Sequence, residues 1–222
     1  IVGADSVQIY RGFDIGSGKP TPSELQGVPH HLLDVAEPTD DFDAARFVRM
    51  ADAAIAGIWS RGRRAILCGG SYLWVKALLE GLAEAPSGSP ELRAELRAEA
   101  QARGAAAMHQ SLAEVDAKTA SRLHPNDELR VLRALEVFRL TGKPLSAFHE
   151  EHGFRARRYR ARKVALAWSK EALAARMESR IANMLASGWV DEVRSLVSRG
   201  YAETRPMRSV GYFEVHQHLE GH

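Results

Sequence analysis

The feature that most constrains the fold of this chain is a short apolar segment followed directly by a glycine turn and a helix. Residues 65–68 (AILC) have the length and apolar character of a buried strand. Gly69 and Gly70 allow a tight turn, and residues 72–81 continue as a helix. Strand, tight turn and helix in this order form the repeating unit of parallel α/β sheets, so we predict an α/β fold.

The start of the chain places polar residues at the end of another expected strand. Residues 1–4 (IVGA) are apolar, and Asp5 and Ser6 follow where the strand gives way to a glycine-rich loop. Ligands of open α/β sheets bind outside the carboxyl ends of the strands, and a carboxylate there can act as a general base. Position alone favours the plainer interpretation, in which Asp5 caps the following turn.

The rest of the chain predicts a helical segment inserted into the α/β core. Residues 42–62 carry apolar side chains at helical spacing. From Ser89 to about Gly153 the pattern is only helical, within an expected insertion of residues 86–159, whereas residues 164–168 (VALAW) are typical of a core strand. We therefore expect an α/β core of residues 1–85 and 160–222, interrupted by a helical insertion domain.

Composition excludes few functions. The 222 residues fit one domain with an insertion, and the net charge of +2 does not by itself indicate nucleic-acid binding. The single cysteine, Cys68, excludes an internal disulfide, and its setting predicts a buried strand position without thiol chemistry. No apolar stretch approaches the roughly 18 residues of a membrane span, and no signal peptide is visible. We expect a cytoplasmic monomer.

One short segment is strongly basic. Residues 155–163 (RARRYRARK) hold six Arg or Lys residues in nine positions, with a tyrosine among them. Such a segment can attract a phosphate backbone, or it can be a solvated loop that returns to the core. The sequence leaves both interpretations open.

Five ordered segments resemble the tRNA dimethylallyltransferases. Residues 4–20 (ADSVQIYRGFDIGSGKP) are similar to the family pattern ADSxQxYRGxDIGTAKP. The other four are residues 69–82 (GGSYLWVKALLEGL), 123–138 (LHPNDELRVLRALEVF), 176–196 (RMESRIANMLASGWVDEVRSL) and 206–212 (PMRSVGY). The similarity extends over nearly the whole chain.

The resemblance implies a reaction and its partners. In this family a dimethylallyl group passes from dimethylallyl diphosphate to N6 of the adenosine at position 37 of tRNA, 3′ of the anticodon. The tRNAs concerned read codons that begin with U. The resemblance further implies a P-loop NTPase-like parallel sheet core, a helical insertion that contacts tRNA, and Mg²⁺ as cofactor.

The resemblance also assigns residues to roles. Asp5 matches the general base that removes a proton from the adenine amine, and Arg180 matches an arginine that contacts the diphosphate. The expected tRNA-binding residues are Ser6, Gln8, Ser71, Arg93, Arg130, Arg133 and Arg208. Spacing alone places Arg130 and Arg133 on one helix face, where they could grip phosphates or form surface ion pairs.

One family element is not found. The pattern G-x-x-x-x-G-K-[ST] is absent, and Pro20 follows Lys19 where a phosphate loop needs Ser or Thr. We expect this chain to lack the N-terminal phosphate loop, with the main Mg²⁺ ligands, and the C-terminal basic helix; no residue here is assigned to a metal. The alternatives are a P-loop nucleotide or nucleoside kinase and an inactive tRNA-binding fragment.

Overall fold

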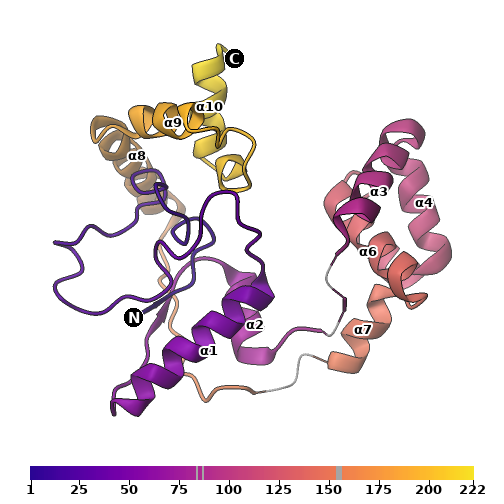
Figure 1. Ribbon diagram of the computed structural model, residues 1–222, viewed down its shortest axis with the longest axis horizontal. Helices are drawn as coiled ribbons and strands as arrows, with labels where there is room; N and C mark the ends of the chain where they lie inside the picture. The colour runs from indigo at the N-terminus through magenta and orange to yellow at the C-terminus, as the bar shows by residue number, and fades with distance from the viewer. Residues whose placement is uncertain (84, 87, 154–156) are drawn as a thin grey trace. The chain divides into compact units, whose positions relative to one another are not determined.

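The computed structural model describes residues 1–83, 85–86, 88–153 and 157–222, which form two compact units (Figure 1). Unit 1 consists of residues 1–79 and 159–222, and unit 2 of residues 80–158. The sequence placed these boundaries after residues 85 and 159. No described helix is both long enough and apolar enough to cross a membrane.

Unit 1 is built around a small parallel sheet. Strand β1 (Val2–Gly3) pairs with β2 (Leu67–Cys68) in the register Val2 to Leu67 and Gly3 to Cys68. On the other edge of β1, His31 forms a parallel bridge to Val2. The fold is therefore mixed α/β with mostly helical content, and the α/β class expected from the sequence is confirmed.

The turn after β2 lies directly against the end of β1. The backbone N–H of Ala4 donates to the carbonyl of Cys68 at 2.8 Å, and the N–H of Ser71 donates to the carbonyl of Ala4 at 3.0 Å. A Cβ at Gly69 would lie 2.2 Å from the carbonyl oxygen of Ala4. Only glycine permits this approach, so Gly69 determines how closely the two strand ends meet.

The helices of unit 1 pack with the sheet and with the loops around it in one hydrophobic core. Asp43 caps α1 (Ala44–Ser60) by accepting from the N–H of Arg46, and Trp74 stacks on Phe47 with ring centroids 4.7 Å apart. Trp74 is therefore buried in the core of unit 1. The other helices of unit 1 are α2 (Tyr72–Glu80), α8 (Lys170–Ala186), α9 (Trp189–Ser198), the 3-10 helix η1 (Pro206–Arg208) and α10 (Tyr212–Glu220).

Unit 2 has its own hydrophobic core, and helices are the only regular secondary structure in its described residues. Its helices are α3 (Pro90–Arg103), α4 (Ala105–Val115), α5 (Ala117–Ala120), α6 (Glu128–Thr141) and α7 (Leu145–His152). Leu96, Met108, Leu112, Val131 and Leu135 belong to one buried cluster drawn from α3, α4 and α6. Since this core is made within the unit, unit 2 has the anatomy of an independent domain.

Two expectations about strands are wrong. Residues 164–168 form no strand, because none of them shares a backbone hydrogen bond with another described residue, and Val164 and Leu166 are more than 80% exposed. Cys68 is exposed, although it lies in β2 as expected. Ile66 is exposed too. Since alternate residues of an extended chain point to the same side, Ile66 and Cys68 lie on one face, and no described element covers that face.

The close approach at Gly69 gives a first prediction. We expect Gly69→Ala to destabilise unit 1 by about 3 kcal/mol, because the added methyl group collides with backbone that cannot move aside. Urea unfolding followed by tryptophan fluorescence measures this change. Gly70→Ala is the matched control, since a Cβ there meets no atom within 4 Å. Equal stability of the two variants would contradict the role given to Gly69.

Candidate active site

Asp5 lies just beyond the carboxyl end of β1, where its carboxylate organises the following turn. One oxygen, Oδ1, accepts hydrogen bonds from the backbone N–H groups of Val7 at 2.8 Å and Gln8 at 3.1 Å. The second oxygen, Oδ2, has no hydrogen-bond partner among the described residues. The capping role allowed by the sequence is therefore present, and it leaves one oxygen of this half-buried carboxylate available to a substrate.

Ser6 and Ser71 meet beside Asp5. The hydroxyl oxygen of Ser71 accepts a hydrogen bond from the backbone N–H of Ser6 at 2.9 Å. Ser71 follows the glycine turn after β2, so the two strand ends are joined at this point by a side chain as well as by backbone. Three of the residues expected in the site, Asp5, Ser6 and Ser71, are thus brought together.

Gln8 connects the Asp5 turn to a second loop. Its Nε2 donates to the carbonyl oxygens of Ser17 at 3.1 Å and Gly18 at 3.0 Å. These carbonyls belong to residues 12–19, which we call the glycine loop. Gln8 therefore uses its amide donors to fix this loop, while its Oε1 has no hydrogen-bond partner among the described residues.

A cavity of about 840 Å³ lies between the glycine loop and α8. Arg176 and Arg180 contribute positive charge to its lining, and the Nη2 of Arg180 donates to the carbonyl of Ser17 at 3.4 Å. Leu173, Met177 and Met184 give the same cavity an apolar side. Sequence reasoning assigned Arg180 and missed Arg176, although their spacing of four residues on one helix signals a shared face.

Lys19 also borders this cavity, but its charge is already neutralised. Its side chain is 6% exposed, and its Nζ lies 2.6 Å from Asp14 and 2.5 Å from Asp34. The Nζ also donates to the carbonyl of Tyr10 at 2.8 Å. Lys19 therefore closes the glycine loop onto its neighbours instead of acting as the free cation of a phosphate loop.

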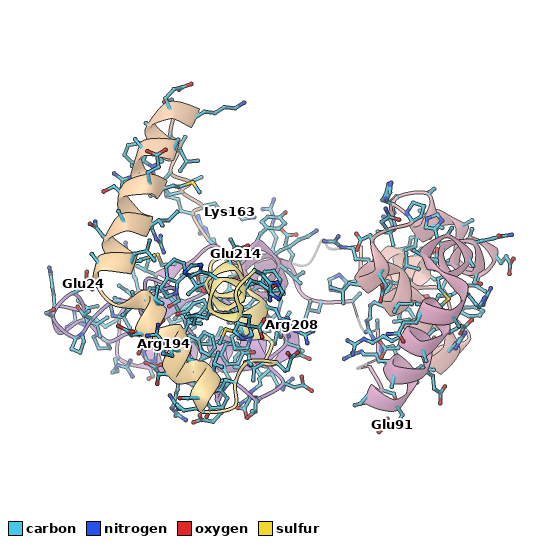
Figure 2. All side chains as sticks on the ribbon, turned by 90° about the horizontal axis from the view of Figure 1, so that it is seen from above. Glu24, Glu91, Lys163, Arg194, Arg208 and Glu214 are labelled. Carbon is cyan, nitrogen blue, oxygen red and sulfur yellow. The ribbon has the colours of Figure 1, made fainter. Side chains whose placement is uncertain are left out.

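Arg208 makes no hydrogen bond or ion pair with the residues around Asp5. It is labelled in Figure 2 and lies on η1, which packs against α10. Its Nη2 is 3.0 Å from Glu203. Both side chains are largely exposed, so this ion pair contributes little to stability. The structure therefore leaves Arg208 outside the group formed by Asp5, Ser6, Gln8 and Ser71.

In unit 2 the arginines pair differently from the expectation. Arg133 turns inward, where Nη1 lies 2.5 Å from Glu136 and Nη2 donates to the carbonyl of Pro86 at 2.6 Å. Arg93 reaches the other oxygen of the same fully buried carboxylate at 2.9 Å. Arg130 instead binds Asp127 at 2.5 Å on the surface. The structure thus joins Arg133 to Arg93 through Glu136, and Arg130 stands apart.

The basic segment is described from residue 157 onward, so Arg155 lies outside the described residues. Tyr159 packs its ring against Trp59 with centroids 5.7 Å apart, which places the segment beside the end of α1. Arg160 and Arg162 are exposed and form no ion pair with a described residue. Lys163, labelled in Figure 2, ends the run.

The comparisons with known proteins agree with the motifs. A family model described as IPP transferase matches residues 8–222. A tRNA dimethylallyltransferase of Sorangium cellulosum (strain So ce56) is 55% identical over 221 residues, which cover all of this chain and 70% of that relative. The chain belongs to the tRNA dimethylallyltransferase family. The resemblance seen in the sequence is therefore confirmed.

Other tRNA dimethylallyltransferases and their structures are also similar. A relative from Geobacter metallireducens (strain ATCC 53774 / DSM 7210 / GS-15) is 48% identical over 222 residues, covering all of this chain and 72% of the relative. The crystal structure of a full-length tRNA isopentenylpyrophosphate transferase from Bacillus halodurans is 34% identical, with a TM-score of 0.65 over 99% of this chain and 68% of that one. A eukaryotic dimethylallyltransferase acting on tRNA shares the fold at 22% identity, with a TM-score of 0.72 over 99% of this chain and 59% of that one.

Membership of the tRNA dimethylallyltransferase family does not supply a metal site within the described residues. No three His, Cys, Asp or Glu side chains in residues 1–83, 85–86, 88–153 and 157–222 come together in a way that could hold a metal ion. The donor set present here therefore does not fit a resident Mg²⁺.

The buried Glu136 cluster gives a second prediction. We expect Glu136→Ala to lower the free energy of unfolding of unit 2 by about 2 to 3 kcal/mol, because it removes the shared partner of two arginines from a buried position. Thermal unfolding followed by circular dichroism tests this.

Glu99 offers a matched control, since it also pairs with two arginines, Arg103 and Arg139, but at the surface. Glu99→Ala should cost less than about 1 kcal/mol. If the two variants were equally stable, the burial of Glu136 would not increase its contribution to the stability of unit 2.

Proposed function

We propose that this chain is a tRNA dimethylallyltransferase acting on N6 of adenosine 37, in tRNAs that read codons beginning with U. The amine nitrogen attacks C1 of dimethylallyl diphosphate, and the bond between C1 and the diphosphate oxygen breaks. The proton of the amine passes to Asp5, and diphosphate leaves. The observation that carries this proposal is that Asp5 and the cationic cavity are connected through one loop, by the hydrogen bonds of Gln8 and Arg180.

The environment of Asp5 suits a base for a weakly acidic amine. A general base must come within hydrogen-bond distance of the proton it removes, and the free Oδ2 at the carboxyl end of β1 offers such a contact. Ser6, Gln8 and Ser71 lie within the same hydrogen-bonded group and offer polar atoms for a base turned out of its stack.

The cavity beside α8 suits an amphipathic ligand. Arg176 and Arg180 can bind diphosphate oxygens, and an arginine near a departing diphosphate stabilises the negative charge that develops there. Leu173, Met177 and Met184 provide apolar surface of the kind that a five-carbon prenyl chain would contact. The cavity therefore offers cations for the diphosphate and apolar side chains for the dimethylallyl group.

The finer features of the family are part of the same proposal. We propose a P-loop NTPase-like core for unit 1, supported by its parallel strands and by the glycine turn before α2. We also propose a monomer that works in the cytoplasm with tRNA. Mg²⁺ would assist the departing diphosphate, but the described residues do not fit it, and no step is assigned to a metal that they hold.

Unit 2 would bind the tRNA. Arg93 and Arg133 are 47% and 33% exposed, so each keeps guanidinium surface for a phosphate while Glu136 fixes its position. Arg130, paired with Asp127 at the start of α6, adds a more exposed cation. The alternative of an inactive tRNA-binding fragment shares these contacts and differs only in the transfer step.

The central prediction concerns Asp5. We expect Asp5→Asn to lower the rate of prenyl transfer by at least about 100-fold, because the amide keeps the turn-capping oxygen but cannot accept the proton. The assay measures transfer of labelled dimethylallyl groups to an anticodon stem-loop that carries adenosine at position 37. Binding of the stem-loop should change less than about threefold, since the fold of the turn is retained.

Asp43→Asn is the matched control, because it makes the same chemical change at the cap of α1, away from Asp5. It should retain transfer. Loss of less than threefold in Asp5→Asn would exclude Asp5 as the base. Tight stem-loop binding without transfer by the wild-type chain would favour the inactive fragment.

The last prediction of this subsection concerns the contribution of the basic segment to RNA binding. The affinity for the anticodon stem-loop should fall as the salt concentration rises. If Arg160 and Arg162 contact phosphates, replacing both with Ala should make the slope of log affinity against log salt concentration shallower by about 1.5. Arg194→Ala is the control, because that guanidinium is already paired with Asp191. An unchanged slope in the double variant would identify the segment as a solvated loop.

A further inference from the structure

Glu192 makes an unusual set of contacts with the glycine loop. It lies on α9, and its Oε2 accepts hydrogen bonds from the backbone N–H groups of Asp14 at 3.1 Å and Ile15 at 2.7 Å. Its Oε1 accepts from the N–H of Gly16 at 3.2 Å. Three successive backbone N–H groups that converge on one anion form a nest, and here a carboxylate of the chain itself fills it.

Two further contacts fix this carboxylate. The hydroxyl of Tyr212 donates to Oε1 of Glu192 at 2.6 Å. Burial and the neighbouring Glu192 raise the pKa of Tyr212, so the phenol stays protonated and remains a donor at neutral pH. A Cβ at Gly16 would lie 1.9 Å from Nε1 of Trp189, so the loop can approach α9 this closely only with glycine at that position.

The loop held by Glu192 is the loop that reaches the candidate active site. Its next two residues, Ser17 and Gly18, supply the carbonyls that accept from Nε2 of Gln8. Ser17 also accepts from Arg180, and the N–H of Gln8 donates to Asp5. A continuous path of hydrogen bonds and backbone therefore runs from Glu192 to both the proposed base and the proposed diphosphate ligand.

We infer that Glu192 is a positioning residue for the prenyl transfer, acting through the glycine loop on Asp5 and Arg180. The inference rests on the proposed function. Its physical basis is that the N–H groups of residues 14–16 point toward α9, and only an acceptor with two oxygens satisfies all three together with Tyr212. Lys19 holds the far end of the loop, so Glu192 sets the end nearest α9.

The test uses Glu192→Gln, which keeps the shape of the side chain but has a single acceptor oxygen. The replaced oxygen becomes a donor that faces an N–H or O–H group, so part of the loop must move away. We expect the KM for dimethylallyl diphosphate to rise about tenfold or more, and kcat to fall by a smaller factor. Amide exchange should become faster at Val7 and Gln8 as well as at residues 14–16.

The matched control is Asp116→Asn in unit 2. That buried carboxylate likewise accepts from two backbone N–H groups, of Thr119 and Ser146, and from the hydroxyl of Thr119. It should lower the unfolding temperature comparably while leaving KM and the exchange of Val7 and Gln8 unchanged. If Glu192 only stabilised the fold, Glu192→Gln and Asp116→Asn would change KM and amide exchange to the same extent.

Two results would overturn the inference. One is faster exchange at residues 14–16 in Glu192→Gln with no change at Val7 and Gln8, which would mean that the loop moves without affecting Asp5. The other is an unchanged KM. Failure of the proposed function is separate, because it would appear as no transfer by the wild-type chain, whereas the exchange measurement and calorimetric binding of dimethylallyl diphosphate need no transfer.

Discussion

The close contact between the turn after β2 and the end of β1 is the constraint on which the candidate active site depends. Gly69 passes over the backbone of Ala4 with no room for a side chain. Because of this contact, Ser71 can bond to the backbone of both Ala4 and Ser6. Asp5 is then held at the rim of the sheet by its own turn. A few backbone atoms therefore fix the place where the proposed base would meet its substrate.

Carboxylates shape both units of this protein. In unit 1, Glu192 satisfies backbone N–H groups that no strand or helix uses, and in unit 2, Glu136 aligns two guanidinium groups from different helices. Both acids bind positively polarised groups that belong to surfaces we propose to contact substrate. An acid that accepts several hydrogen bonds orders a polar site in a way that apolar packing cannot, because hydrogen bonds have direction.

Local sequence signals predicted the parts of the structure that local chemistry controls. The helix over residues 42–62 and the turn at Gly69 follow from apolar spacing and from glycine, and the cap formed by Asp5 follows from its position after a strand. The strand expected at residues 164–168 is absent, since a strand also needs a hydrogen-bonding neighbour, which its own sequence does not specify. The sequence also did not indicate that Arg133 would share a partner with Arg93 instead of lying beside Arg130. That arrangement depends on the buried carboxylate of Glu136, which binds arginines from two different helices.

Helix α8 has a consequence for how unit 1 opens. None of its residues is fully buried, although it carries Arg176 and Arg180 at the cavity. Detaching such a helix exposes little new surface, and the dependence of an opening reaction on denaturant scales with the surface exposed. We therefore expect the amides of α8 to exchange with solvent through small local fluctuations instead of through unfolding of the whole unit. The wall of the proposed diphosphate site is thus joined to the loop that leads to Asp5 by the hydrogen bond from Arg180 to Ser17 and by little buried packing.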